Sequence, residues 1–249
     1  MNLDGKRTII TGGLSGIGRM LVARVLKAGA VVGVLDIDVA GFGRFEQEYP
    51  GARCIACDVT DPAKVQSAVD EFCREFGGVD ILVNNAGILF SAPLVALTAQ
   101  GIAKHDIAMW EKVISTDLSS VFYMTVNVVE KMVLKRTKGL IVNISSISAV
   151  GNAGQSAYSA AKAGVNALTK TWAKELGPLG IRVVGIAPGF IDTDSTHAAL
   201  SETVLQSIIK KVPLRRLGTA EEVSHAVMAV IENDLVNGTI VEIDGGLTV

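Results

Sequence analysis

Short apolar runs rich in β-branched residues alternate with helical stretches along the whole chain, and this alternation most restricts the possible folds. Seven runs predict strands: RTIIT, VVGVLDI, RCIACDV, DILVNN, LIVNIS, IRVVGIA and TIVEID. Helices are predicted between them, around residues 16–28, 39–48, 62–76, 109–136, 157–176, 201–210 and 220–233. Apolar strands separated by helices are typical of a parallel sheet that is covered on both faces.

The sequence therefore predicts a single α/β domain over residues 1–249, in which right-handed crossovers wind helices onto both faces of a seven-stranded sheet. No repeat or low-complexity linker divides the chain. Residues 88–108 and 190–212 are too long for simple connections, and both follow the carboxyl ends of strands. We expect them to be loops that form the walls of a substrate site.

Composition excludes several classes of function. A net charge of -2 without a dense Lys/Arg run gives no footprint for nucleic acid. No stretch reaches the roughly 20 apolar residues of a membrane span, and the first residues lack the pattern of a signal peptide, so we expect a cytoplasmic protein. Cys54, Cys57 and Cys73 are expected to be reduced thiols, and no metal site is expected.

A glycine cluster follows the first strand in TGGLSGIG, residues 11–18. Gly12, Gly16 and Gly18 would let the backbone turn tightly and approach a pyrophosphate at the positive end of the next helix. In isolation the cluster is equally well explained as a tight turn.

Asp36 closes the second strand 20 residues after Gly16. A carboxylate there accepts hydrogen bonds from both hydroxyls of an adenosine ribose, as in a dinucleotide-binding Rossmann fold. A 2′-phosphate would meet a like charge, and neither Ser15 nor Ile37 can pair with it. The sequence therefore favours NAD over NADP as the cofactor.

Polar residues also follow the next two strands, as Asp58-Val59 and as NNAG, residues 84–87. The carboxyl ends of parallel strands are where this architecture binds ligands. Each group taken alone is equally typical of a turn.

Tyr158 and Lys162 lie one helical turn apart in QSAYSAAKAG, so their side chains share one face of a helix. The ammonium would lower a phenol pKa that is normally about 10 and prepare a base for alcohol oxidation, or an acid for ketone reduction. A serine after the preceding strand, in NISSIS, would donate a hydrogen bond to the same substrate oxygen.

In this order, TGGLSGIG, Asp36, DV, NNAG, NISS, YSAAK and APGFIDT resemble the short-chain dehydrogenase/reductase family over essentially the whole chain. The resemblance implies Tyr158 as the acid/base and Lys162 as its pKa modifier and a ligand of the nicotinamide ribose. It implies cofactor contacts from Gly12, Leu14, Ser15, Gly16, Ile17, Gly18, Asp36, Asp58, Val59, Asn85, Ala86, Gly87, Tyr158, Lys162, Pro188, Gly189, Ile191 and Thr193.

Two positions depart from the family pattern. Asp117, in DLSS, stands where members usually carry an asparagine of the proton relay, so the relay through this residue is in question. The catalytic serine is Ser145 by its distance of thirteen residues from Tyr158, but Ser146 by the match along the strand. We favour Ser146 because the strand is the more rigid anchor, with Ser148 as a third option.

Residues 88–108 and the C-terminal stretch look most like type 10 hydroxyacyl-CoA and hydroxysteroid dehydrogenases. We therefore expect an NAD-dependent enzyme that interconverts a secondary alcohol and its ketone, with a 3-hydroxyacyl-CoA as a candidate substrate. The alternatives are a 3-oxoacyl-ACP reductase that uses NADPH and a nucleotide-binding scaffold without turnover. Family members are commonly tetramers, and Ala160, Ala161, Ala163 and Gly164 would allow close contact between subunits or within the chain.

Overall fold

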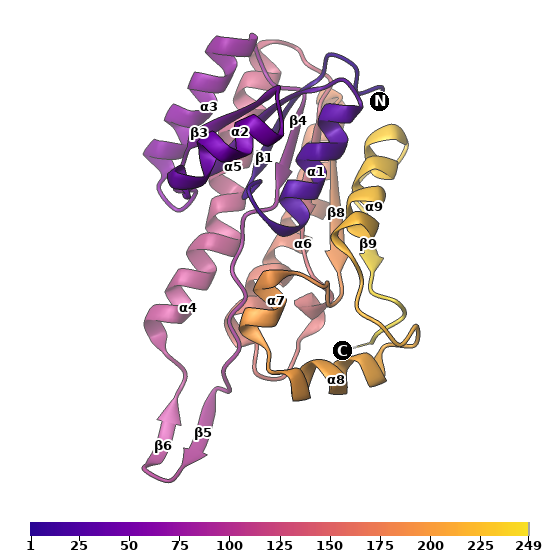
Figure 1. Ribbon diagram of the computed structural model, residues 1–249. Helices are drawn as coiled ribbons and strands as arrows, with labels where there is room; N and C mark the ends of the chain where they lie inside the picture. Colours follow the sequence, from indigo (N-terminus) through magenta and orange to yellow (C-terminus); the bar gives the residue numbers. More distant parts are fainter. Residues whose placement is uncertain (249) are drawn as a thin grey trace.

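A computed structural model describes residues 1–248, and within this range seven parallel strands form one sheet (Figure 1). The strands are β1 (Arg7–Thr11), β2 (Val31–Asp36), β3 (Ala52–Ala56), β4 (Ile81–Asn84), β7 (Leu140–Ile144), β8 (Arg182–Pro188) and β9 (Ile240–Ile243). Their order is β3-β2-β1-β4-β7-β8-β9, so the direction of winding reverses between β1 and β4. Sheets of this kind bind ligands outside the carboxyl ends at that switch point. The predicted fold class is confirmed.

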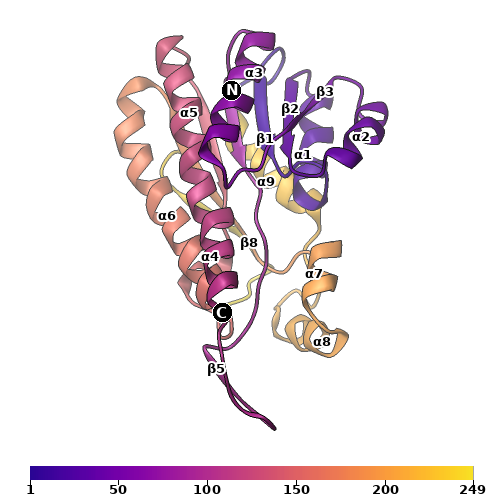
Figure 2. The same ribbon diagram turned by 90° about the vertical axis from the view of Figure 1, so that its left-hand side faces the viewer.

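Helices cover both faces of the sheet (Figure 2). One layer consists of α1 (Gly16–Lys27), α2 (Phe42–Glu48) and α9 (Ala220–Glu232), and the other of α3 (Pro62–Phe76), α5 (Ser120–Leu134) and α6 (Ser156–Leu176). Local signals set their ends: Asp61 caps α3 through the N–H groups of Ala63 and Lys64, and Gly77 ends it with a φ of 81°. Within the described residues, no helix has both the length and the apolar character required to cross a bilayer.

Alternating side chains of each central strand build two separate core layers. Ile10 and Val34 pack with α1 and α9, whereas Ile9 and Leu35 pack with α3 and α5. All four side chains are 0% exposed. Each such burial contributes about 1.5–3 kcal/mol, and the apolar strands thus hold the carboxyl edge of the sheet in place.

Residues 88–108 differ from the irregular loop that the sequence predicts. They contain β5 (Val95–Thr98) and β6 (Gly101–Lys104), an antiparallel hairpin that projects from the body below α4 (Ile107–Ile114; Figures 1 and 2). The side chain of Leu97 at its tip is 90% exposed. The strands are short and bury no core face, and their connection lacks the Asn-Gly signal of a tight hairpin, so the pattern does not reveal them.

Two further predicted segments are subdivided. The helix predicted over 109–136 consists of α4 (Ile107–Ile114), a π-helical turn (Ser115–Ser119) and α5. Residues 190–212 contain α7 (Asp194–Ala199) and α8 (Glu202–Lys211). The π-helical turn inserts an extra residue into the helical repeat, which redirects the side chains around Asp117.

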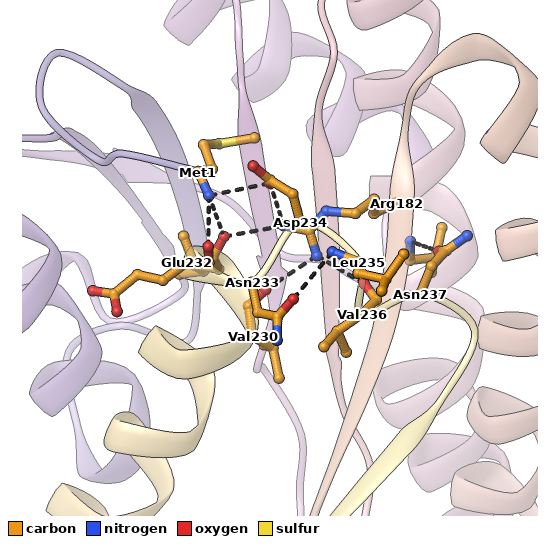
Figure 3. A network of polar contacts seen from close by, with 11 residues as sticks. Met1, Arg182, Val230, Glu232, Asn233, Asp234, Leu235, Val236 and Asn237 are labelled. Atoms are coloured by element: carbon orange, nitrogen blue, oxygen red, sulfur yellow. Dashed lines mark hydrogen bonds and ion pairs between the residues drawn. The ribbon is translucent and has the colours of Figure 1, made fainter.

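Arg182, the first residue of β8, holds the end of α9 (Figure 3). Its guanidinium donates hydrogen bonds to the main-chain oxygens of Val230, Ile231 and Val236 and to the Asp234 carboxylate. The amino group of Met1 also contacts Asp234, at 3.1 Å. The last carbonyls of a helix have no partner within it, so these donors satisfy them. One end of β8 is thereby fixed, and its other end leads into the cleft described below.

Candidate active site

The carboxyl ends of the central strands border a cleft of about 910 Å³. This volume lies at the upper end of the usual range for small-molecule and cofactor sites. Every site residue predicted from the sequence lines the cleft except Leu14 and Gly18. Residues from eight separated segments of the chain are thus brought together at the switch point of the sheet.

The glycine turn after β1 forms one wall of the cleft. Gly12 and Gly16 have φ angles of 63° and 52°, which side chains rarely tolerate. Gly18 lies beneath the turn, where an added Cβ would stand 2.2 Å from the Gly12 oxygen. Ser15 precedes α1 but makes no side-chain capping bond, so the first N–H groups of this helix remain available to an anion in the cleft.

Asn85 ties the end of β4 to this glycine turn. Its Nδ2 donates to the main-chain oxygens of Thr11 and Gly12 at 3.0 and 2.9 Å. The Thr11 hydroxyl in turn accepts hydrogen bonds from the main-chain N–H groups of Asn85 and Ala86. These bonds fix the spacing between the two strands on either side of the switch point.

Two carboxylates lie at the ends of β2 and β3. Asp36 accepts hydrogen bonds from the N–H groups of Leu14 and Asp38, at 3.3 and 3.1 Å, which hold its carboxylate at the rim. Asp58 accepts two hydrogen bonds from Thr60, and these lower the pKa of the Asp58 carboxyl. Val59, beside it, is buried.

The segment after β8 forms the opposite wall. An added Cβ at Gly189 would lie 2.8 Å from the Cα of Asp244, so only glycine fits beside the end of β9. Ile191 is buried, and the Thr193 hydroxyl accepts a hydrogen bond from the N–H of Thr196 to cap α7. The backbone from Pro188 to Thr193 therefore runs along the cleft in a fixed path.

The two candidate serines have different surroundings. The Ser145 hydroxyl donates to Asn166 Oδ1 at 2.6 Å, so it is engaged with α6. The Ser146 hydroxyl accepts from the N–H of Ser148 at 3.1 Å and also interacts with the Tyr158 side chain. Ser148 is buried as well. Of the three, Ser146 is the serine whose hydroxyl lowers the pKa of the Tyr158 phenol.

Tyr158, Lys162 and Asp117 meet at the centre of the cleft. Lys162 Nζ lies 5.5 Å from the centre of the Tyr158 ring, as their spacing on α6 predicts. The ammonium donates to the Ile144 oxygen at 3.0 Å and lies 3.3 Å from Asp117 Oδ2. The other oxygen of Asp117 accepts from the N–H of Ile88 at 2.9 Å.

The pKa of the Tyr158 phenol is shifted upward in this structure, contrary to the expected net lowering. Burial is the largest cause and raises this pKa, while Lys162 lowers it and Asp117 raises it. Burial also raises the pKa of the Asp117 carboxyl, against the effect of Lys162. For Lys162, burial lowers the pKa, but Asp117 and Tyr158 raise it more, so the ammonium form persists. Lys162 thus lowers the pKa of Tyr158, as predicted, but burial raises this pKa by more.

Several lining residues were not identified from the sequence. Gln155 is buried and donates to the Ser91 hydroxyl at 3.2 Å, which attaches the foot of the β5–β6 hairpin to the start of α6. The lining also includes Ile147, and Ile88, Leu89, Phe190, Ser195 and Ala198 line the cleft from within the two segments predicted as its walls. Gln155 and Ile147 belong to no motif, and only their position next to Tyr158 and the candidate serines could have identified them.

His105, at the end of β6, has an unexpected environment for a loop histidine. Its side chain is buried and packs edge-on against Phe90, with ring centres 5.5 Å apart. Phe90 in turn packs against the buried cluster of Val113, Ala157 and Ala161, as Ile88 and Tyr158 also do. The hairpin is therefore anchored to the wall of the cleft through an aromatic contact.

The residues present fit a dinucleotide. The glycine turn leaves a cradle without side chains, the first N–H groups of α1 face an anion site, and the Asp36 carboxylate stands at the ribose position. The arrangement pairs this cradle with a phenol, a serine hydroxyl and a buried ammonium. Such a set can bind a coenzyme and exchange a proton with a substrate oxygen beside it.

Comparisons with known proteins agree with this geometry. The family described as enoyl-(acyl carrier protein) reductase matches residues 12–248. The 3-oxoacyl-[acyl-carrier-protein] reductase FabG of Thermotoga maritima is 38% identical over 256 residues, covering 100% of both chains. Its namesake from Escherichia coli K12 is 37% identical and covers 99% of each. These two relatives carry the 3-oxoacyl name, so they do not support the predicted likeness to type 10 enzymes.

Solved structures give the same result for the fold. The crystal structure of gox2181 matches with a TM-score of 0.89 and 31% identity, covering 98% of this chain and 96% of that one.

Proposed function

The chain belongs to the short-chain dehydrogenase/reductase family and is an oxidoreductase acting on an alcohol and ketone pair, and on this premise we propose that it reduces a 3-oxoacyl thioester with NADH. The names of the relatives favour this substrate class over the 3-hydroxyacyl-CoA oxidation expected from the sequence. A 3-oxoacyl thioester is the product of oxidising a 3-hydroxyacyl thioester, so the same site would serve both directions. The Tyr158–Lys162 pair in a dinucleotide cleft is the observation that carries the proposal.

The residues act on one substrate oxygen. In the direction of reduction, the Tyr158 phenol donates its proton to the carbonyl oxygen while the carbonyl carbon accepts a hydride. The bound nicotinamide supplies that hydride. The Ser146 hydroxyl donates a hydrogen bond to the same oxygen and stabilises the charge that develops there. Lys162, held by Ile144 and Asp117, keeps its ammonium beside the phenol.

NAD(H) is proposed as the cofactor because of Asp36. Its carboxylate is held at the cleft rim by two main-chain N–H groups, where it suits the two hydroxyls of an unphosphorylated ribose. Ile37, the next residue, is 69% exposed and offers no positive charge for a 2′-phosphate. The proposal thus combines the substrate class of the relatives with a cofactor chosen from this chain's own residue.

We also propose a homotetramer in the cytoplasm, as expected from the sequence. The π-helical turn, α5 and α6 form an apolar groove of about 510 Å³ whose lining includes Leu118, Phe122 and Leu168. Ala160 and Ala163 are exposed beside it, which supports contact with another subunit; Ala161 is buried within the chain. The cysteines are unpaired thiols, which supports a reducing compartment.

Replacement of Tyr158 by Phe tests the proposed chemistry. We expect NADH reduction of a 3-oxoacyl thioester to fall at least about 100-fold, because the proton donor is lost, while NADH affinity stays within about threefold. NADH oxidation followed by absorbance and NADH binding followed by fluorescence measure the two effects. Tyr123→Phe, on α5, is the matched control. Residual activity within tenfold of the parent, or no reduction of any 3-oxoacyl thioester by the parent, would contradict the proposal.

A further inference from the structure

Asp117 brings a negative charge to the centre of the cleft. Its side chain is 0% exposed and comes from the π-helical turn between α4 and α5. Its two oxygens have different partners, the N–H of Ile88 at 2.9 Å and the Lys162 ammonium at 3.3 Å. A carboxylate removed from water is costly unless it is paired. Burial raises the pKa of this carboxyl, and the contacts with Ile88 and Lys162 oppose that effect by favouring the carboxylate.

The other charged groups of the cleft are farther from this pair. Lys112 on α4 is an exposed lining residue, and Asp36 and Asp58 lie at the ends of β2 and β3. In the sheet, β2 and β3 are two and three strands away from β4, which leads to Gly87 and Ile88. Strands are about 4.8 Å apart, so those carboxylates are roughly 10 Å or more away. Ser145 and Ser146, after β7, carry no charge.

The two charges act on the Tyr158 hydroxyl in opposite directions. A positive charge near a phenol favours the phenolate, and a negative charge favours the phenol. Because the Asp117 carboxylate lies 3.3 Å from Nζ, the ammonium and carboxylate form a compact pair whose field falls off faster than that of a lone ammonium. The pKa contributions have the same signs: Lys162 lowers the pKa of Tyr158 and Asp117 raises it.

We propose that Asp117 is a positioning residue that fixes Lys162 and offsets its charge at the Tyr158 hydroxyl, so that the site exchanges its proton at higher pH than Tyr158 and Lys162 alone would. This inference rests on the proposed role of Tyr158 as proton donor and acceptor. In reduction, the phenol O–H bond breaks as the substrate O–H bond forms, and the phenolate then recovers a proton from solvent. Asp117 keeps the phenol form populated, and with it the proton that reduction consumes.

Asp117→Asn tests the charge with little change of shape. The amide oxygen can still accept from Ile88, and Lys162 retains the Ile144 oxygen. We expect the midpoint of the pH profile of kcat/KM for alcohol oxidation, and the alkaline midpoint for ketone reduction, to fall by about 1–2 pH units. A purely structural role would lower kcat without moving the midpoint. Asp106→Asn is the control, because this exposed carboxylate caps α4 and asparagine caps equally well.

A titration without substrate separates this inference from the proposed function. The chain has three tyrosines, Tyr49, Tyr123 and Tyr158, and the phenolate absorbance lost in Tyr158→Phe reports Tyr158 alone. We expect this component to titrate above about 10 in the parent and lower in the Asp117→Asn background.

Equal midpoints with and without the Asp117 charge, or a parent midpoint at or below that of free tyrosine, would overturn the inference. If Asp117→Asn does not fold, the titration of Tyr158 in the parent protein alone decides whether the inference stands. A protein that turns over no thioester but shows the titration shift would contradict only the proposed function.

Discussion

Neutralising Asp36 should reverse the coenzyme preference that we propose for this enzyme. Asp36→Asn keeps the shape of the side chain and one oxygen, which can accept from Leu14 or from Asp38, but it removes the negative charge. The parent carboxylate repels a 2′-phosphate on the adenosine ribose, and the variant does not. The kcat/KM for NADPH should therefore rise relative to that for NADH.

The magnitude follows from Coulomb's law. A phosphate of about two negative charges, placed about 5 Å from one carboxylate at an effective dielectric constant of about 40–80, is destabilised by about 2–3 kcal/mol. Removing this repulsion corresponds to a gain of about 30- to 150-fold for NADPH. NADH should lose up to about tenfold, because its ribose hydroxyls then donate to a neutral amide rather than to a carboxylate.

Initial rates with each reduced coenzyme, at saturating 3-oxoacyl thioester, give the ratio of kcat/KM values. Asp38→Asn is the matched control: its carboxylate lies two residues away and is directed toward Gly41, so the ratio should change less than fivefold. Added salt should weaken discrimination in the parent more than in Asp36→Asn. A parent that already prefers NADPH, or a ratio that Asp36→Asn leaves within fivefold, would refute the reasoning.

Two further predictions concern the serine and the assembly. Ser146→Ala should lower kcat for reduction about 100-fold with little change in coenzyme binding. Ser145→Ala should chiefly lower the free energy of unfolding, by about 1 kcal/mol, because it breaks a partly buried hydrogen bond to Asn166. Equal modest losses of kcat in both variants would contradict the assignment. Light scattering of the parent should give four chains per particle, and Phe122→Glu should dissociate it. Leu235→Glu, at a site 92% exposed outside the groove, should not, and a monomeric parent would exclude the tetramer.

Sequence patterns predicted most of the fold because its determinants are local. Apolar β-branched runs such as residues 140–144 have no alternative to a buried strand, and Asp61 with Pro62 marks the start of α3 unambiguously. The hairpin in residues 88–108 was missed for the opposite reason. Its strands are largely exposed, so their sequence shows no alternation of apolar and polar residues, and no typical turn motif joins them.

Sequence motifs predicted which residues line the cleft, but they did not predict how burial and neighbouring charges shift the pKa of Tyr158. The glycine turn and the Tyr158–Lys162 spacing follow from backbone geometry, which a motif specifies. The choice between Ser145 and Ser146 rests on side-chain partners that no motif specifies, because the Ser145 hydroxyl donates to Asn166 whereas the Ser146 hydroxyl accepts from Ser148. The net effect on Tyr158 depends on burial and on the Asp117 charge, which act through space and leave no local signal.

The segment after β4 links coenzyme binding to proton exchange. Asn85 holds the oxygen of Gly12, and an added Cβ at Gly12 would lie 2.9 Å from the Cα of Ala86, so the segment packs directly against the glycine turn. Two residues further, an added Cβ at Gly87 would lie 2.9 Å from Asp117 Oδ2, and Ile88 donates to the same carboxylate. Any displacement of this segment therefore moves the pyrophosphate cradle and the Asp117–Lys162 pair together. In the function that we propose, one short stretch of backbone would therefore set the alignment of hydride and proton transfer.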